Sequence, residues 1–391
     1  MLTPSKMVLS AILGSLAVLS LALLLWQWLV ARRFPLYQRA PAQPFRPAIT
    51  LLKPLKGWDG ATEDCLRSWL SQDYPGRLQI LFGADSSQDP VCEIVNKLLR
   101  EFPALDAQLV VCVSSLGANP KVSKLVELDR LAKHEILVIS DADVRVPPDF
   151  LTQVVAPLRE AEVGLVNCFY QLANPTTLAM QWEAIAINAD FWSQVLQARS
   201  LKPLDFALGA VMVIRREQLE EIGGFRAVVD CLADDYQLGN RIARLGLRIA
   251  ISPVVAECWS APMGWTAVWK HQLRWARTIR VCQPRPYFFS ILSNATLWPL
   301  LWLLASPSSL ALAFCAGCCL LRGWAALDLQ QRLTRSRAHV DYWWFVPIKD
   351  LLQAVIWLAA FLGNRIEWRG ERMLLRRDGT LVRGAPQLFE H

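Results

Sequence analysis

The feature that most constrains this chain is an uncharged segment that runs from Val8 to Val30. As a helix, it is long enough to cross the hydrocarbon core of a bilayer. It is also longer than the apolar core of a signal peptide, and Arg32 and Arg33 stand where a small-residue cleavage site would lie. The segment therefore predicts an uncleaved transmembrane anchor over residues 1–32.

The charges on either side of this segment predict its orientation. Only Lys6 precedes it, whereas Arg32, Arg33, Arg39 and Arg46 follow it. Positively charged flanks favour the cytoplasm, so we expect the region after the anchor to be cytoplasmic. A hydrophobic content of 53% and 17 tryptophans also favour an integral membrane protein, placed in a bacterial inner membrane or its equivalent.

The last third of the chain is again apolar. Three uncharged or nearly uncharged segments stand there: Phe288–Ala305, Ser309–Leu327 and Tyr342–Gly363. Three crossings would place the arginine-rich residues 365–391 outside, whereas two crossings would keep them inside. Since Lys349 and Asp350 interrupt the last segment, we expect it to be partly buried or re-entrant. Residues 287–364 are thus predicted to form a membrane region of two or three helices, followed by a basic cytoplasmic tail.

Between the anchor and this region, the pattern is that of an α/β domain over residues 47–286. A proline-punctuated linker, Ala40–Pro47, precedes it. Apolar strand-like runs then alternate with helical segments, which predicts a mainly parallel sheet covered by helices. Such sheets bind ligands at the carboxyl ends of their strands. The strand-like runs are "AITLL", "LQILFGA", "LVVCV", "EILVIS", "VGLVNCFY", "GAVMVIR" and "LRIAIS". The 10 cysteines show no disulfide or zinc spacing and are predicted to be free thiols.

Acidic residues stand at the predicted strand ends. Asp85 follows one strand, and Asp141 and Asp143 follow another in a D-x-D arrangement. Two oxygen donors at this spacing suit a divalent cation, Mg²⁺ or Mn²⁺, which can also hold a diphosphate. Asp234 and Asp235 precede a helical segment, where an acid can cap the helix or take part in chemistry.

A basic and aromatic motif, "HQLRWARTIR", precedes the apolar final third. Guanidinium groups such as those of Arg274 and Arg277 suit phosphate oxygens, and the face of Trp275 suits a sugar ring. An interfacial helix with its tryptophans at the lipid headgroups and its arginines on acidic lipids is the alternative interpretation. Both interpretations are compatible with the sequence.

Taken in order, Asp, D-x-D, Asp-Asp and xxRW in a membrane-anchored α/β chain resemble the ceramide glucosyltransferase family. The resemblance extends from Thr50 to Arg280, and "HQLRWARTIR" also resembles bacterial relatives that glycosylate hopanoids. One departure stands out, because His271 occupies the position at which the family has Gln or Arg, with Gln272 one place late. Further matching stretches are "LLKPLKG", "NPKVSKL", "DADVRVPPDFL", "RREQLEEIGGF" and "ADDYQLGNRIA".

The resemblance implies an inverting transferase with a GT-A (Rossmann-like) catalytic domain. It implies UDP-glucose as the donor and ceramide as the acceptor, giving glucosylceramide at a bilayer, with no nucleic acid as a partner. By family matching, Asp235 is the catalytic base, and Asp234 beside it caps the helix and lies among the substrate-binding residues. Asp141, with Asp143 as the second acid, is expected to bind the metal.

Other roles also follow from the resemblance. Asp85 is expected near the uridine or its ribose, and Lys53 and Lys121 near the phosphates. Arg274 and Trp275 are expected to bind substrate. The segment Leu178–Ala198, which lies between the D-x-D and the base, is where related transferases bind their acceptor.

Several alternatives stay open. The acceptor is a hopanoid or diacylglycerol in one of them, and the donor sugar is N-acetylglucosamine in another. A processive polysaccharide synthase is disfavoured, because such enzymes have more membrane helices and share the motif from which His271 departs. A non-catalytic membrane scaffold is disfavoured by the presence of Asp141, Asp235, Arg274 and Trp275.

Overall fold

The computed structural model describes residues 4–39, 45–368 and 371–383. Part of the predicted linker Ala40–Pro47 and part of the predicted basic tail therefore lie outside the described residues. The chain divides into two compact units, each built from several stretches of sequence. The sheet unit comprises Pro35–Asn174, Lys202–Ala261 and Glu371–His391, and the helical unit comprises Met1–Phe34, Pro175–Leu201 and Pro262–Gly370.

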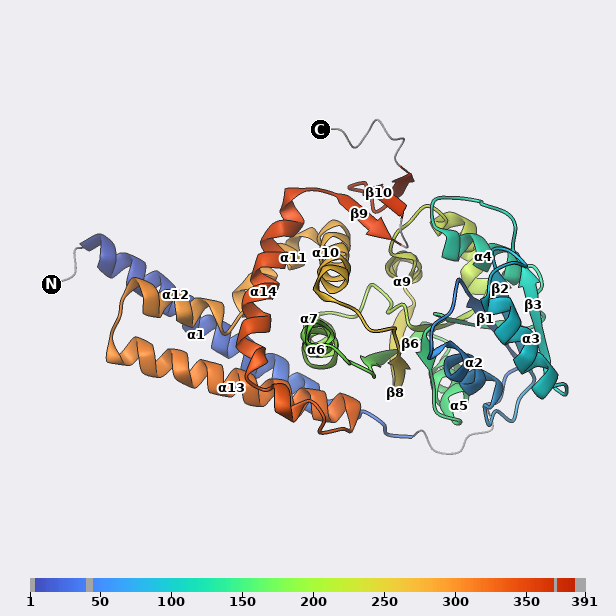
Figure 1. Cartoon of the computed structure of the whole chain (residues 1–391), viewed down its shortest axis with the longest axis horizontal. Coiled ribbons are helices and arrows are strands. Elements are labelled where there is room, and N and C mark those ends of the chain that lie inside the picture. The colour runs from blue at the N-terminus through green and yellow to red at the C-terminus, as the bar shows by residue number, and fades with distance from the viewer. Residues whose placement is uncertain (1–3, 40–44, 369–370, 384–391) are drawn as a thin grey trace. The chain divides into compact units, whose positions relative to one another are not determined.

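The sheet unit is built around an eight-stranded sheet with the order β3-β2-β1-β4-β7-β6-β8-β5 (Figure 1). Strands β3, β2, β1 and β4 run parallel to one another, whereas β7 is antiparallel to both β4 and β6. All seven strands predicted from the sequence are present, together with the short β5. The strands are β1 (Ile49–Pro54), β2 (Leu78–Ala84), β3 (Asp106–Val111), β4 (Ile136–Ser140), β5 (Val144–Arg145), β6 (Val163–Leu172), β7 (Val211–Arg215) and β8 (Arg248–Cys258).

Helices cover this sheet and bury its apolar side chains. Trp69 of α2 packs edge-on against Phe150 of α5, with ring centroids 5.6 Å apart, and its indole N–H donates to the carbonyl oxygen of Val144 at 2.9 Å. This bond anchors β5, which directly follows the D-x-D residues. The helices are α2 (Thr62–Leu70), α3 (Val91–Glu101), α4 (Pro120–Asp129), α5 (Phe150–Val155), α8 (Arg216–Glu221) and α9 (Asp234–Arg244), and a hairpin of β10 (Glu371–Leu375) and β11 (Leu381–Arg383) completes the unit.

The helical unit contains three described helices that are long and apolar enough to cross a membrane. They are Pro4–Arg33 (α1), Ser309–Thr334 (α13) and Phe345–Leu362, which comprises α14 (Phe345–Ala359) and the turn after it. In Figure 1, α1 and α13 run beside α12 (Leu297–Ala305). The remaining elements are α6 (Leu178–Ile185), the π-helical η2 (Ala186–Phe191), α7 (Trp192–Leu201), α10 (Trp265–Cys282), α11 (Pro284–Ser290) and β9 (Arg365–Trp368).

The helical structure of the apolar final third is broken in its first segment and not in its last. Helices over Pro284–Ser293 and Leu297–Ala305 are bent by 57°, so the first of the three segments is a broken span or a re-entrant loop. Asn294 stabilises the break, because its side-chain oxygen accepts hydrogen bonds from the backbone N–H groups of Thr296 and Leu297. The last segment, expected to be partly buried or re-entrant, is a single helix over Phe345–Leu362 that is partly buried.

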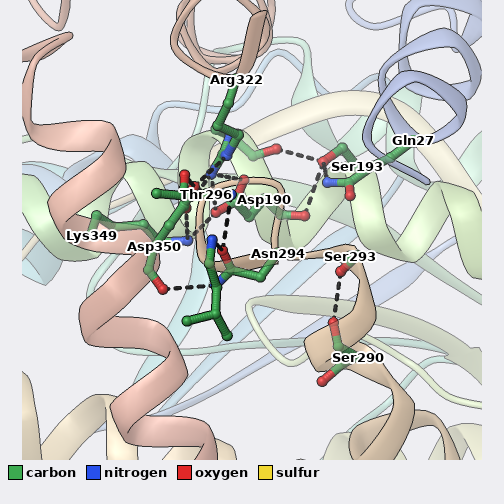
Figure 2. A network of polar contacts seen from close by, with 12 residues as sticks. Gln27, Asp190, Ser193, Ser290, Ser293, Asn294, Thr296, Arg322, Lys349 and Asp350 are labelled. Atoms are coloured by element: carbon green, nitrogen blue, oxygen red, sulfur yellow. Dashed lines mark hydrogen bonds and ion pairs between the residues drawn. The ribbon is translucent and has the colours of Figure 1, made fainter. Parts of the chain in front are cut away.

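The charges of α14 do not break it because they are neutralised inside the unit, as Figure 2 shows. Arg322 of α13 donates to both carboxylate oxygens of Asp350 at 2.8 and 2.9 Å and to those of Asp190 at 2.9 and 3.0 Å. Lys349 pairs with Asp190, and the Thr296 hydroxyl donates to Asp350 at 2.7 Å. Asp190, Arg322, Lys349 and Asp350, here called the charge quartet, are all buried.

Candidate active site

Three strands deliver polar side chains to one edge of the sheet. Because β1, β2 and β4 are parallel, their carboxyl ends lie on the same side. Asp85 directly follows β2, Asp141 directly follows β4, and Lys53 stands near the end of β1. This is the edge at which open α/β sheets bind ligands.

Helix α4 brings two lysines to this edge. Its first residue is Pro120, and the side chain of Asn119 caps it by accepting hydrogen bonds from the backbone N–H groups of Lys121 and Val122 at 3.0 and 3.2 Å. The Asn119 amide also donates to the carbonyl oxygen of Cys231 at 2.8 Å, which ties the start of α4 to the loop before α9. Lys121 and Lys124 are three residues apart and thus lie on one face of the helix.

Lys121 joins the acids of two different motifs. Its ammonium nitrogen lies 2.8 Å from Asp141 Oδ1 and 3.0 Å from Asp234 Oδ2. Burial opposes the charge on this lysine, but Asp141 and Asp234 outweigh burial and raise the pKa of Lys121. Lys121 is therefore a permanent positive charge between the D-x-D and the Asp-Asp pair.

Asp234 does not cap α9, contrary to the expectation from the sequence. The helix begins at Asp234 itself, and Ala233, whose methyl side chain cannot make a capping hydrogen bond, occupies the N-cap position. The Asp234 carboxylate faces Lys121 instead. The Lys121 ammonium, 3.0 Å from Asp234 Oδ2, thus takes the carboxylate that could otherwise cap the helix.

Asp235 lies in a confined position beside Gly209. A Cβ atom at Gly209 would come within 2.8 Å of Asp235 Oδ2, so a larger residue there would displace this carboxyl group. Asp235 Oδ1 accepts a hydrogen bond from the backbone N–H of Tyr236 at 2.8 Å. Burial, together with the negative charge of Asp234, raises the pKa of Asp235 to about 7. The two adjacent acids thus differ, since Asp234 is paired with a cation and Asp235 is poised to exchange a proton near neutral pH.

The other predicted donor-binding residues already have partners. Asp85 is paired with Lys124, a buried lysine of α4. Lys53 is fully buried and donates to Ser140 Oγ at 3.2 Å and to the carbonyl oxygen of Asp141. Burial lowers the pKa of Lys53 to about 8. Lys53 thus holds the end of β4, and its contact with a phosphate stays a prediction.

The donor set at the D-x-D fits a hard divalent cation that brings further ligands with it. The Asp141 side chain is 37% exposed, and Asp143 is also exposed. Within the described residues, no group of three or more His, Cys, Asp or Glu side chains could hold a metal ion. Magnesium-type ions bind through one or two carboxylates together with substrate phosphates, so two accessible aspartates match that mode.

Arg274 and Trp275 belong to α10 of the helical unit. The Trp275 ring lies 4.8 Å from the His271 ring and 6.2 Å from the Phe191 ring. His271 and Gln272, at the motif position that departs from the expected pattern, both contact Glu183 of α6. The binding of substrate by Arg274 and Trp275 stays a prediction.

Sequence reasoning missed several residues of the site. The Lys121–Lys124 spacing within "NPKVSKL" was a usable signal for Lys124. Gly209 and Tyr170 gave none, because only the folded sheet brings them near the acids. Burial raises the pKa of Tyr170, and the nearby Asp235, Asp141 and Asp143 carboxylates raise it further. All ten cysteines are free, as predicted.

Comparison with known sequences supplies the family context. The model of glycosyl transferase family 21 matches residues 12–381. Ceramide glucosyltransferase 3 of Caenorhabditis elegans is 24% identical over 243 residues, which cover 62% of this chain and 52% of that protein. Ceramide glucosyltransferase of Candida albicans is 35% identical over 121 residues, which cover 28% of this chain and 22% of that protein. The chain therefore spans about half the length of the Caenorhabditis relatives that it matches, and less of the Candida relative.

A solved structure supports the fold. A mannosyltransferase from Pyrobaculum calidifontis, in complex with GDP-Man and Mn²⁺, matches with a TM-score of 0.53 and 23% sequence identity. The match covers 90% of this chain and 99% of that one. The predicted GT-A fold is thereby confirmed.

Proposed function

The chain belongs to glycosyl transferase family 21, and we propose that it is a hexosyltransferase that moves glucose from UDP-glucose to a hydroxyl group of ceramide. This activity is the one for which the related ceramide glucosyltransferases are named, and the chain spans only part of their length. The observation that carries the proposal is Asp235, whose raised pKa suits proton transfer, beside the Asp141–Lys121–Asp234 group.

In the proposed reaction, Asp235 is the base. The acceptor hydroxyl loses its proton to the Asp235 carboxylate while its oxygen attacks the anomeric carbon, and the bond from that carbon to the UDP oxygen breaks. Attack opposite the departing UDP inverts the anomeric centre. A carboxylate with a pKa near the working pH is effective in this role, because it is both partly ionised and basic enough to take the proton.

The leaving group needs positive charge. Lys121 is held as a cation between Asp141 and Asp234, so it is available to a developing phosphate charge at this edge of the sheet. Asp141 and Asp143 would hold a divalent cation, Mg²⁺ or Mn²⁺, that acts as a Lewis acid on the diphosphate when bound. Asp85, held by Lys124, is proposed to contact the uridine or ribose.

The site is further proposed to work at the cytoplasmic face of a membrane. The described chain has helices able to cross a bilayer, and the arginines after α1 favour the cytoplasmic side for the sheet unit. Residues 47–286 are proposed as the catalytic domain, with Arg274 and Trp275 as its substrate-binding residues on α10.

A transfer assay with competing lipids tests the proposal. Purified membranes containing the chain receive labelled UDP-glucose or UDP-N-acetylglucosamine, with ceramide, diacylglycerol and a hopanoid as acceptors. We expect label in ceramide from UDP-glucose. Label in diacylglycerol or the hopanoid would overturn the acceptor and keep the reaction type, and no labelled lipid from either donor would contradict the transferase assignment.

A further inference from the structure

Helices α6 and α10 of the helical unit are joined by a buried carboxylate. Figure 1 shows α10 beside α6. Glu183 of α6 is 1% exposed, and its Oε1 atom lies 2.6 Å from His271 Nδ1. The Gln272 amide donates to the same oxygen at 3.1 Å. The imidazole of His271 is therefore held at one nitrogen by a carboxylate, an arrangement that fixes the ring orientation and directs the other nitrogen to a ligand.

Hydrogen-bonding capacity is left unused around this contact. Within the described part of the chain, Glu183 Oε2 and the indole N–H of Trp182 are buried and make no hydrogen bond. His271 Nε2 also has no protein partner there, and the His271 side chain is 28% exposed. Buried polar groups in folded proteins are rarely left unsatisfied, so Glu183 Oε2 and the Trp182 N–H indicate a polar ligand, and the exposed part of the His271 ring is accessible to it.

The surroundings of His271 suit the headgroup of a lipid. The Trp275 ring lies against the imidazole edge-on, and Phe191 lies against Trp275. Trp265 and Trp269 of α10 both pack on Trp182. Tryptophan-rich helices with a polar side are typical of the depth at which a membrane changes from acyl chain to headgroup.

We propose that His271 binds a non-reacting hydroxyl group of the lipid acceptor through Nε2, and that Glu183 is its positioning residue. A hydroxyl group both donates and accepts, so it can pair with Nε2 in either protonation state of the ring. The inference deepens the proposed function and depends on it only for the identity of the lipid. His271 then sets acceptor choice at the motif position where the sequence departs from Gln or Arg.

A binding measurement with two lipids tests this assignment. Ceramide and 3-deoxyceramide, which keeps the reacting hydroxyl on C1, are titrated in detergent micelles into the full chain while tryptophan fluorescence is followed. We expect the wild type to bind ceramide roughly tenfold more tightly, which is the size of one hydrogen bond. His271→Phe is expected to bind both lipids equally, and His271→Gln, which keeps a hydrogen-bonding group, to recover part of the preference.

The controls keep the outcomes separate. His339→Phe removes another histidine of the helical unit, one whose Nε2 contacts the Leu327 carbonyl, and is expected to keep the preference. The preference is a ratio, so it does not depend on the fraction of folded protein. A wild type without preference, or a His271→Phe variant that keeps it, would overturn the inference. Failure of glucose transfer in the separate assay would contradict the proposed function and leave the binding result intact.

Discussion

Asp235 differs from an ordinary surface aspartate because it is enclosed. Its carboxyl group lies against Gly209, next to a second acid, and this environment raises its pKa to about 7. A base must be deprotonated to act, so kcat/KM for transfer is expected to rise with pH up to about 7 and then to level off. The measurement is a pH profile of lipid glucosylation at low donor concentration, and a profile that is flat across neutral pH would contradict this role.

The same pKa predicts a dependence of folding stability on pH. Between pH 3.8, the ordinary pKa of an aspartate, and about 7, Asp235 keeps its proton in the folded protein and loses it in the unfolded chain. The free energy of unfolding therefore falls as pH rises through this interval. Asp235→Asn carries no such charge and is expected to gain in melting temperature over the wild type as pH increases. Melting curves of both proteins at mildly acidic and mildly alkaline pH check this, and an unchanged difference between them would count against the raised pKa.

Gly209 offers a test that leaves every charge in place. Gly209→Ala would push a methyl group to within 2.8 Å of Asp235 Oδ2 and displace the carboxyl group. We expect kcat to fall by roughly 10²-fold, since such a displacement spoils proton transfer, with little change in KM. Gly60→Ala, at a glycine with open space around it, is the matched control. Equal activity of the two variants would exclude close packing at Gly209 as a requirement.

At the scale of residues, the sequence identified the acids but not their partners. Asp85, Asp141 and Asp143 could be found because they follow apolar strands, which is a local signal. The bridge from Lys121 to Asp234 links residues more than a hundred positions apart, and no local pattern predicts such a pair. Competition between Lys121 and the helix terminus for Asp234 is likewise decided only in the folded protein.

At the scale of elements, the charge quartet joins η2, α13 and α14. It contains two acids and two bases, so its net charge is zero, and Arg322 contacts both acids. Arg322→Met would leave two buried carboxylates facing a single lysine. Breaking a buried pair in this way costs about 3–5 kcal/mol, whereas removing a balanced pair costs much less.

The prediction is therefore a partial rescue. Arg322→Met is expected to lower the melting temperature of the chain in detergent markedly, and Arg322→Met combined with Asp350→Asn, which leaves Asp190 paired with Lys349, to recover most of the loss. Arg337→Met, at an exposed arginine, is the control and should match the wild type. If the double variant is less stable than the single one, the quartet does not act through charge balance.

Elements with a clear period were predictable from the sequence, and irregular ones were not. The strands and α2 to α4 follow from alternating apolar runs. The bend at Asn294 lies inside an uncharged segment, and the π-helix at Ala186–Phe191 lies directly between α6 and α7, so hydropathy alone does not reveal either one. The charges of Lys349 and Asp350 led to the expectation of a partly buried or re-entrant last segment. Their partners Asp190 and Arg322 come from distant parts of the chain, so the sequence could not show that these charges are neutralised.

At the scale of the whole molecule, the units do not follow simple sequence boundaries. The segment Leu178–Ala198, predicted to bind the acceptor, belongs to the helical unit, where Gln27 donates to Ser193 Oγ at 2.6 Å. Its apolar residues fit a helix that packs on the sheet as well as one that contacts the membrane, so composition could not assign the segment to either unit. The assignment of residues 47–286 to one catalytic domain therefore stays a prediction.

A metal dependence is also expected of the whole enzyme. Because Asp141 and Asp143 offer a cation only two carboxylates, the ion is expected to bind weakly without the diphosphate. Chelation of divalent cations should abolish lipid glucosylation, and Mg²⁺ or Mn²⁺ should restore it. Full activity in excess chelator would exclude the D-x-D metal role and leave Lys121 as the main charge for the leaving group.

The central claim is that Asp235 takes the proton of a lipid hydroxyl during transfer. Its most direct test is the kcat for label moving from UDP-glucose into lipid, measured with the wild type, Asp235→Asn and the surface variant Asp106→Asn. A base of this kind contributes roughly 10²–10⁴-fold, so that loss is predicted for Asp235→Asn alone, without a fall in melting temperature. An Asp235→Asn enzyme that transfers glucose at the rate of Asp106→Asn would contradict the account.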